Sequence, residues 1–310
     1  MGLRQVLARG GVAFGVTLTI ADPFVAEVMA SQAFDFLMID TEHSPMSSYQ
    51  LQNQLIALRP SRAAVLVRVP DRDENAAMQA LDLGAEGVFI PHVETGAQCA
   101  AAVRAALYPP RGTRGVGPRR AARLTDRETY FRRANDDTFV GVMLESGPAV
   151  DNIDDILAVP GLGGVIIGTE DLAASLGHLN DLRHGDVIKA IEQISQRCAA
   201  AGVPFGRYAA TADAAEALIS AGARLITVGS DLLFLEQGMR AAADRVFPRR
   251  RRPAGPSATS ATLATSAMPA TSATSAMPAT SATPATPATS ATPATPSTDF
   301  SARTREEGRT

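Results

Sequence analysis

Eight short apolar runs alternate with helix-like patterns along most of this chain, and this alternation restricts its fold more than any other feature. Each run is nearly continuous rather than alternately apolar and polar, which is typical of parallel strands covered on both faces. Eight strand–helix units predict an α/β fold, a (β/α)8 TIM barrel. A doubly wound open sheet is the alternative, but no GxGxxG turn follows the first run. The runs are GVAFGVTLTI, FDFLMID, AAVLVRV, AEGVFIP, TFVGVMLE, LGGVIIG, GVPFGRY and ARLITVG.

Charge and cysteine content argue against several classes of function. The 310 residues carry a net charge of −3, which gives no general attraction to nucleic acid or to a membrane surface. No run is long and apolar enough to span a bilayer, and MGLRQVLARG at the start does not resemble a signal peptide. The two cysteines, Cys99 and Cys198, form no paired-cysteine motif, so we expect a cytoplasmic protein.

The composition changes sharply near residue 249. PRRRRPAG is followed by repeats of Pro, Ala, Thr and Ser with almost no charge and almost no large apolar side chain. Such a segment cannot bury enough surface to offset the entropy lost on ordering. We therefore predict a barrel domain over residues 1–248 and a disordered tail over 249–310. The arginines at 249–252 are interpreted as a solvated junction, with a weak anionic contact as the alternative.

Polar side chains gather where the predicted strands end. In a TIM barrel the carboxyl ends of all strands meet at one face, which carries the active site. Ionisable groups at the end of an apolar strand are costly unless they are paired or bind a metal. The convergence therefore predicts a functional site on this face. Its members are Asp40, Glu42 and His43 after the second run, Arg68 in the third, His92 after the fourth, Glu145 after the fifth, and Gly168, Thr169, Glu170 and Asp171 after the sixth.

Glu145 and Asp171 are the predicted metal ligands. They follow adjacent strands, with no cysteine or histidine in the same turns. Carboxylates suit a hard divalent ion such as Mg²⁺ or Mn²⁺, with Co²⁺ as a further option. The alternative is that Glu145 pairs with an arginine and Asp171 caps the helix that follows it.

The D-x-E-H turn and the arginine of the third run suggest acid–base chemistry. His43 is a candidate general base, with Asp40 holding its tautomer, and Glu42 is a candidate acceptor for metal-bound water. Arg68 can stabilise a developing oxyanion or enolate. The alternative for His43 is a histidine satisfied by a backbone carbonyl. Arg68 can also form a structural ion pair with Glu42, which does not exclude its role at the oxyanion.

A basic, glycine-rich loop, YPPRGTRGVGPRRAAR, begins at residue 108. Glycines let backbone N–H groups approach an anion, and arginines bind carboxylates bidentately. We place the loop at the functional face and predict that it recognises an acidic substrate. A solvated basic loop is the alternative.

Taken together, the motifs FDFLMIDTEHSP, VLVRVP, LYPPRGTRGVG, VMLES and GVIIGTEDLAASLG resemble the HpcH/HpaI aldolase and citrate lyase family. The resemblance covers roughly residues 3–247 and implies a barrel of the phosphoenolpyruvate/pyruvate-binding type. It implies Glu145 and Asp171 as metal ligands, Arg68 on the enolate, and an acid–base dyad of Asp40 and His43. It also implies a homo-oligomer, often a hexamer, whose last helix packs on a neighbouring subunit.

The resemblance further implies that the backbone from Gly168 to Glu170 holds the substrate carboxylate. Three positions depart from the family pattern. Met143 stands where a glutamine is common, Tyr208 where leucine is common, and Thr169-Glu170 where Pro-Ala or Pro-Asn is usual. With Arg207 beside it, Tyr208 suggests a substrate with an additional carboxylate.

The single lysine restricts the reaction. A Schiff-base aldolase needs a lysine in its barrel, but Lys189 lies in the helical stretch VIKAIEQISQR. We therefore predict a metal-dependent aldolase (a carbon–carbon lyase) that forms pyruvate, or a similar keto acid, and an aldehyde. One alternative is a citrate-like condensation of oxaloacetate with an acyl thioester in siderophore precursor synthesis. The other is a non-catalytic, keto-acid-binding barrel.

Overall fold

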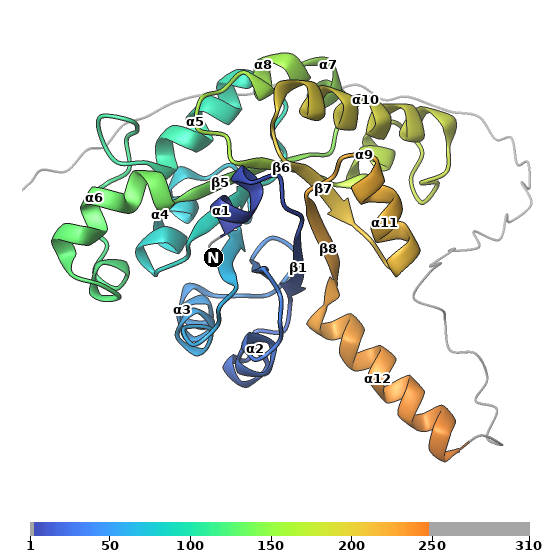
Figure 1. Ribbon diagram of the computed structural model, residues 1–310, viewed down its shortest axis with the longest axis horizontal. Helices are drawn as coiled ribbons and strands as arrows, with labels where there is room; N and C mark the ends of the chain where they lie inside the picture. The colour runs from blue at the N-terminus through green and yellow to red at the C-terminus, as the bar shows by residue number, and fades with distance from the viewer. Residues whose placement is uncertain (1–2, 248–310) are drawn as a thin grey trace, which may run out of the picture. The chain divides into compact units, whose positions relative to one another are not determined.

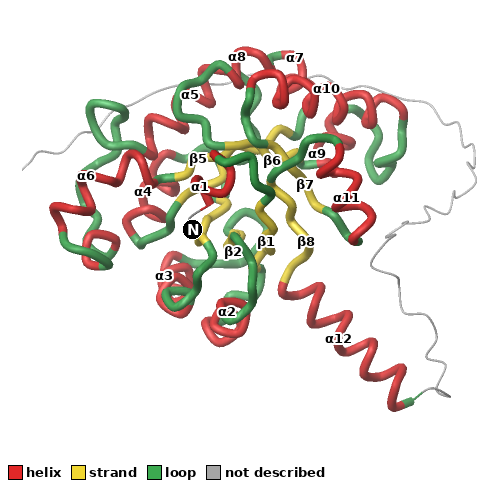
Figure 2. Tube along the Cα trace, viewed as in Figure 1, coloured by secondary structure: helices red, strands yellow, loops and turns green. Residues whose placement is uncertain are grey.

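A computed structural model describes residues 3–247 of the chain, and its centre is a closed parallel barrel (Figures 1 and 2). The eight strands follow one another around the barrel in sequence order, β1 to β8, and β8 closes it against β1. The predicted TIM barrel is therefore confirmed, while the predicted tail 249–310 lies outside the described residues. The strands are β1 (Ala13–Leu18), β2 (Phe36–Asp40), β3 (Ala64–Arg68), β4 (Gly87–Ile90), β5 (Phe139–Leu144), β6 (Gly164–Ile167), β7 (Phe205–Tyr208) and β8 (Leu225–Ser230).

Helices cover the outside of the barrel, and local capping residues define where many of them begin. Ser47 forms a capping box with Gln50, while Asp73 and Thr95 each accept a hydrogen bond from a backbone N–H of the first turn. The helices are α1 (Leu3–Ala8), α2 (Pro23–Ala30), α3 (Ser48–Ala57), α4 (Glu74–Asp82), α5 (Gly96–Ala106), η1 (Ala121–Arg123), α6 (Arg127–Asp137), α7 (Gly147–Asp151), α8 (Ile153–Leu157), α9 (Thr169–Ser175), α10 (Gly185–Ala201), α11 (Ala212–Ser220) and α12 (Asp231–Val246).

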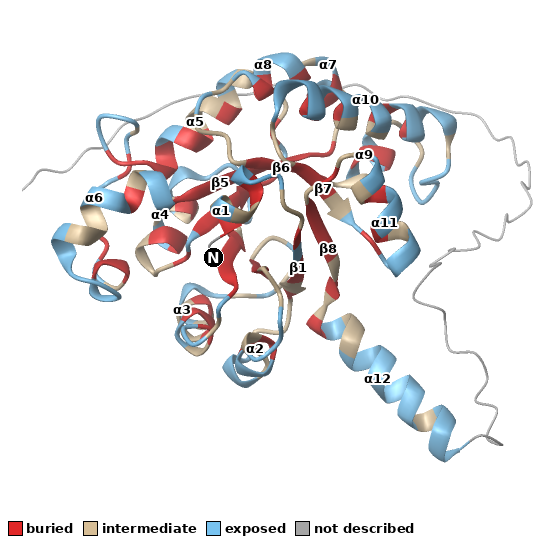
Figure 3. Ribbon diagram, viewed as in Figure 1, coloured by how far each residue is buried: buried red, intermediate tan, exposed pale blue. Residues whose placement is uncertain are grey.

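Two apolar layers explain why the strand segments are apolar at nearly every position. One layer fills the barrel and includes Phe36, Phe89 and Phe139, and the other lies between the strands and the helices. Figure 3 shows the strands as almost uniformly buried. Gly141 is necessary inside the barrel, because a Cβ there would overlap the Phe89 ring. Because alternate residues of each strand face these two layers, the strand ends are held in fixed positions.

The basic loop lies at the amino end of the barrel, so its predicted place at the functional face is wrong. It connects α5 to β5, and helices of this fold return the chain to the amino ends of the strands. Arg114 in this loop is 3% exposed, and its Nη2 donates to Asp82 Oδ1 at 2.6 Å. Its guanidinium also lies 4.5 Å from the centre of the Tyr108 ring. Arg114 is therefore a structural residue.

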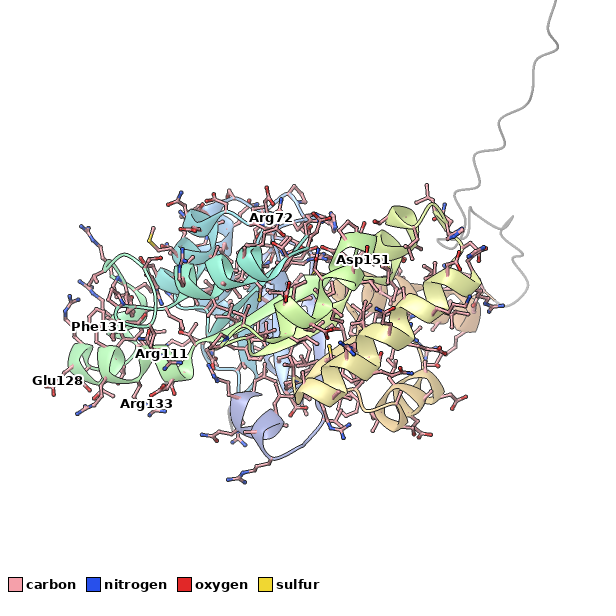
Figure 4. All side chains as sticks on the ribbon, turned by 90° about the horizontal axis from the view of Figure 1, so that it is seen from above. Arg72, Arg111, Glu128, Phe131, Arg133 and Asp151 are labelled. Atoms are coloured by element: carbon pink, nitrogen blue, oxygen red, sulfur yellow. The ribbon has the colours of Figure 1, made fainter. Side chains whose placement is uncertain are left out.

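Other loop arginines support the same placement. Arg120 donates to the backbone carbonyls of Leu83 and Leu55, which lie just after α4 and near the end of α3. Figure 4 shows Arg111 and Arg133 together near α6, apart from Arg72, which follows β3. The loop thus ties together helix ends at the amino end of the barrel.

None of the described helices has the length and apolar character that a membrane span requires.

Candidate active site

Asp40, the last residue of β2, organises the turn that follows it. Its Oδ1 accepts hydrogen bonds from the backbone N–H groups of Glu42, at 3.0 Å, and His43, at 3.3 Å. Arg68 donates to both carboxylate oxygens, from Nε at 2.9 Å and from Nη2 at 2.8 Å. Burial alone would raise the pKa of Asp40, but Arg68 and the two backbone N–H groups hold that pKa below its ordinary value. Asp40 is therefore held as a carboxylate that orients Arg68.

Glu42 lies at the centre of the site, with a side chain only 6% exposed. Its Oε1 is 3.0 Å from His92 Nε2, and its Oε2 is 3.2 Å from Arg68 Nε and 3.6 Å from His43 Nε2. Although these distances are short, no donor among the described residues is aligned to form a hydrogen bond with either oxygen. A buried carboxylate without an aligned donor is unfavourable. This arrangement favours an additional cationic group at Glu42.

His92 joins β4 to the same cluster. Its backbone has φ of 54°, which is uncommon for a residue other than glycine, and its backbone N–H donates to Glu145 Oε1 at 2.6 Å. Its Nδ1 lies 3.2 Å from the same oxygen, so the ring bridges Glu42 and Glu145. The sequence places His92 at the end of the fourth run, but gives it no role. Its backbone conformation, which brings the ring between the two carboxylates, is visible only in the structure.

Glu145, directly after β5, is 3% exposed. Burial raises its pKa, the nearby charges of Glu42 and Asp171 raise it further, and the N–H of His92 acts in the opposite direction, so that the net shift is upward. A Cβ at Gly168 would lie 2.5 Å from Glu145 Oε2, so glycine leaves the space that this carboxylate occupies. The site therefore concentrates negative charge in a confined space.

Asp171 lies in the first turn of α9 and is exposed. The helix has Gly168 as its N-cap and no side-chain capping bond, so the alternative role of Asp171 as an N-cap is not what the structure shows. Glu170 is also exposed, and Thr169 is partly buried. The charge of Asp171 contributes to the raised pKa of Glu145, but Asp171 is not among the residues whose ligand atoms lie within 4.8 Å of one another, so its role as a metal ligand stays a prediction.

The remaining predicted residues lie around this cluster in different ways. His43 has a side chain 58% exposed, and the described contact of Asp40 with it is through the His43 backbone. The proposed control of its tautomer by Asp40 therefore stays a prediction. Met143 is buried, with its Sδ 3.8 Å from Arg68 Nη1. Tyr208, at the end of β7, is about half exposed.

Arg207 does not join Tyr208 at the site. It pairs in register with Ile226, which belongs to the layer between the strands and the helices, as does Phe205. Since successive residues of a strand face opposite sides, Arg207 faces the helices and Tyr208 faces the barrel interior. The predicted use of Arg207 for an additional substrate carboxylate is therefore wrong.

The carboxylates and His92 fit a divalent cation. Ligand atoms of Glu42, His92 and Glu145 all lie within 4.8 Å of one another. The unaligned oxygens of Glu42 and the space that Gly168 leaves at Glu145 both agree with a cation at this point. Carboxylate oxygens favour Mg²⁺ or Mn²⁺, while an imidazole extends the range to ions such as Co²⁺.

A TIM barrel whose carboxyl end carries an acidic cluster and a partly buried arginine belongs to a class of barrel enzymes that bind small molecules at this end. Within that class, the chain is a member of the HpcH/HpaI aldolase/citrate lyase family, which it matches over residues 14–237.

Similar proteins cover most of the chain. A hydroxypyruvate/pyruvate aldolase of Deinococcus radiodurans is 39% identical over 255 residues, which are 82% of this chain and 92% of that protein. A 2-keto-3-deoxy-L-rhamnonate aldolase of Klebsiella pneumoniae is 38% identical over 238 residues, covering 76% and 89%. The crystal structure of a family member from Burkholderia cenocepacia J2315 is 38% identical, with a TM-score of 0.75, and the match covers 79% of this chain and 98% of that one.

Proposed function

We propose that this protein is a metal-dependent aldolase that cleaves a 4-hydroxy-2-keto acid to pyruvate, or a similar keto acid, and an aldehyde. The observation that carries the proposal is the placement of Arg68 beside a cluster of carboxylates that fits a divalent cation. The names of the similar aldolases, which refer to a 2-keto-3-deoxy acid and to hydroxypyruvate and pyruvate, agree with a keto-acid substrate.

Glu145 and Asp171 are the proposed metal ligands, with Glu42 and His92 beside them. When bound, a Mg²⁺, Mn²⁺ or Co²⁺ ion would supply Lewis-acid polarisation of the keto acid. The backbone from Gly168 to Glu170 is proposed to hold the substrate carboxylate, since it opens α9 and the first N–H groups of a helix have no partner within the helix.

Arg68 and His43 have separate proposed roles in the cleavage. A base removes the proton of the C4 hydroxyl, the C3–C4 bond breaks, and the electron pair passes into the enolate of the keto acid. His43 can move the proton, because its ring is exposed at the mouth of the barrel. Arg68 stabilises the enolate oxygen, and Asp40 holds its guanidinium in place. Protonation of the enolate at C3 completes the reaction.

Substrate choice is proposed to depend on Met143 and Tyr208. Met143 contacts Arg68, and Tyr208 faces the interior at the carboxyl end of β7. An apolar thioether offers the keto acid no strong hydrogen bond, whereas the tyrosine hydroxyl can donate to a polar group on the aldehyde side. These two residues therefore favour a hydroxylated or acidic aldehyde partner.

We further propose a homo-oligomer, with a hexamer as the expected form. α12 has only Asp231 buried and points away from the barrel in Figures 1 and 3. Leu232, Leu235 and Met239 are about half exposed on this helix and recur at the spacing of one helix face. Such a face would be covered by a neighbouring copy, and a monomer in analytical ultracentrifugation would contradict this.

Cys99 and Cys198 are both free and buried, in agreement with a cytoplasmic location.

The test is retro-aldol turnover of a 4-hydroxy-2-keto acid with a coupled assay for pyruvate. We expect activity with Mg²⁺ or Mn²⁺, loss of activity in EDTA, and recovery when the metal is returned. Full activity in EDTA would overturn the metal requirement. Product formation from oxaloacetate and acetyl-CoA, without retro-aldol turnover, would favour the citrate-like condensation instead. Binding of pyruvate without either reaction would favour a non-catalytic barrel.

A further inference from the structure

A second group of metal-ligating side chains lies in the segment that joins α9 to α10 and in the first turn of α10, outside the site described above. It consists of His178, His184 and Asp186, whose ligand atoms all lie within 4.8 Å of one another. Asp186 Oδ2 is 3.4 Å from His178 Nε2 and 3.6 Å from His184 Nδ1. The two imidazole rings are stacked, with centres 3.4 Å apart. Nothing in the proposed aldolase reaction uses these residues.

Backbone hydrogen bonds hold the two histidines at fixed places in the segment. The N–H of His178 donates to the carbonyl of Ala173 at 2.8 Å, which ties it to the end of α9. The N–H of Asp181 donates to the carbonyl of His178 at 2.9 Å, and the N–H of His184 donates to the carbonyl of Asp181 at 3.1 Å. Asn180, with φ of 64°, lets the chain turn back. The segment therefore brings the histidines together through its own backbone, which reduces the ordering cost of binding a ligand.

The spacing of the ligand atoms agrees with a small tetrahedral ion. Zn²⁺ bound at about 2.0–2.2 Å in a tetrahedral site places its ligand atoms roughly 3.3–3.6 Å apart. The two distances from Asp186, 3.4 and 3.6 Å, are close to that value. His184 Nδ1 accepts a hydrogen bond from the Asp186 N–H at 3.3 Å, which uses the lone pair that a metal ligand offers. Binding would exchange that hydrogen bond for a metal bond and turn one ring out of the stack.

We propose that His178, His184 and Asp186 form a second metal site, which binds a borderline transition-metal dication such as Zn²⁺. The site differs in chemistry from the carboxylate-rich cluster at the carboxyl ends of the strands, since two of its three ligands are imidazoles. Imidazole favours Zn²⁺ and its neighbours in the transition series over Mg²⁺. Water would complete the coordination, since the side chain of Asp186 is 59% exposed. The ion would join the end of α9 to the start of α10.

The test is isothermal titration of the full chain with Zn²⁺ after removal of metals by EDTA and dialysis. The main variant is His178→Gln combined with His184→Asn. Asparagine retains the ability to cap α10, so loss of binding would not reflect loss of the cap. Glu145→Gln weakens the other metal site and isolates this one. Lys189→Ala is the matched control, because its Nζ is 3.9 Å from Asp186 but cannot be a ligand while charged.

We expect the double histidine variant to lose one molar equivalent of Zn²⁺ relative to the wild type, while the Lys189→Ala and Glu145→Gln chains retain that equivalent. Circular dichroism of each variant checks that the barrel is folded. Co²⁺ serves as a second probe, because its visible absorption bands report a tetrahedral site, and these should appear in Glu145→Gln and vanish with the histidines. Equal Zn²⁺ binding by the wild type and the folded double variant would overturn the proposal. The result does not depend on whether the chain has aldolase activity.

Discussion

Arg114, which is buried, and Arg68, whose side chain is 14% exposed, lie at opposite ends of the barrel and show how differently the chain uses the same side chain. Arg114, at the amino end, faces one carboxylate, Asp82, and is further held by the Tyr130 hydroxyl at 3.2 Å and by the Tyr108 ring. Its charge is therefore matched one to one by a carboxylate at the end of α4.

Arg68, at the carboxyl end, lies among more carboxylates than it can neutralise. Burial lowers its pKa, but Asp40, Glu42 and Glu145 outweigh this and raise it. Excess negative charge in a confined place costs stability, and proteins retain such arrangements at functional sites. Burial of an arginine therefore does not identify a functional site, whereas an imbalance of charge around it does.

Replacing each arginine by lysine should give the largest difference between the two ends of the barrel. Arg68→Lys should lower kcat for retro-aldol cleavage by roughly 10²–10³-fold, because an ammonium cannot bind Asp40 bidentately and also reach the enolate. Arg114→Lys should leave kcat within about twofold and lower the free energy of unfolding by about 2 kcal/mol, since the cation–π contact and a buried hydrogen bond are weakened. Steady-state kinetics and urea unfolding measure the two effects. Similar losses of kcat in both variants would contradict the assignment of separate roles.

Asp40→Asn tests how much the charge of Asp40 contributes to stability through Arg68. At pH 7 we expect a loss of about 2 kcal/mol in unfolding free energy, because the charged hydrogen bonds with Arg68 are weakened. The folded-state pKa of Asp40 is lowered, so its stabilisation is complete above the ordinary aspartate pKa of about 4 and is lost as the pH falls through the lowered value.

The difference between wild type and Asp40→Asn should therefore be constant from pH 7 to pH 5 and shrink towards pH 3. Urea midpoints at these pH values provide the measurement. A difference that grows on acidification would show that Asp40 is not held as a carboxylate in the folded protein.

The smallest effect is expected at an exposed pair on α6. Arg133 and Asp137 are separated by four residues, with Nε 3.0 Å from Oδ2 and both side chains more than half exposed. Solvent screens such a pair, so Arg133→Ala should change the unfolding free energy by only about 0.3–0.5 kcal/mol and leave kcat unchanged. A larger loss of stability in thermal or urea unfolding would show that the amino end depends on more than the buried Arg114.

Much of the fold and part of the site could be predicted from local patterns. The continuous apolar runs identify the strands, since a strand covered on both faces must be apolar throughout. Asp40, Arg68 and Glu145 could be placed at the same face, because each stands at the end of a run and all strands of the barrel are parallel. The prediction for the basic loop is wrong because it rests on the arginines and glycines of the loop. The position of the loop, after a helix that returns the chain to the amino ends of the strands, indicates the correct place.

Other features depend on contacts between distant parts of the chain. The sequence offered the ion pair between Arg68 and Glu42 as an alternative, but residues 42, 92 and 145 come together only in the folded barrel, so no local pattern could show that Glu42 also lies beside His92. The same holds for the outward direction of Arg207, which depends on its pairing with Ile226.

The barrel and the face that carries its polar residues follow from the sequence alone, because apolar periodicity and strand direction are local properties that repeat along the chain. The tertiary structure is needed to show which of those polar residues lie close together and which helix face is exposed. It also shows that Arg114 pairs with one carboxylate, whereas Arg68 lies beside several. These depend on distances of a few ångströms between side chains far apart in sequence, and packing of the closed barrel sets those distances.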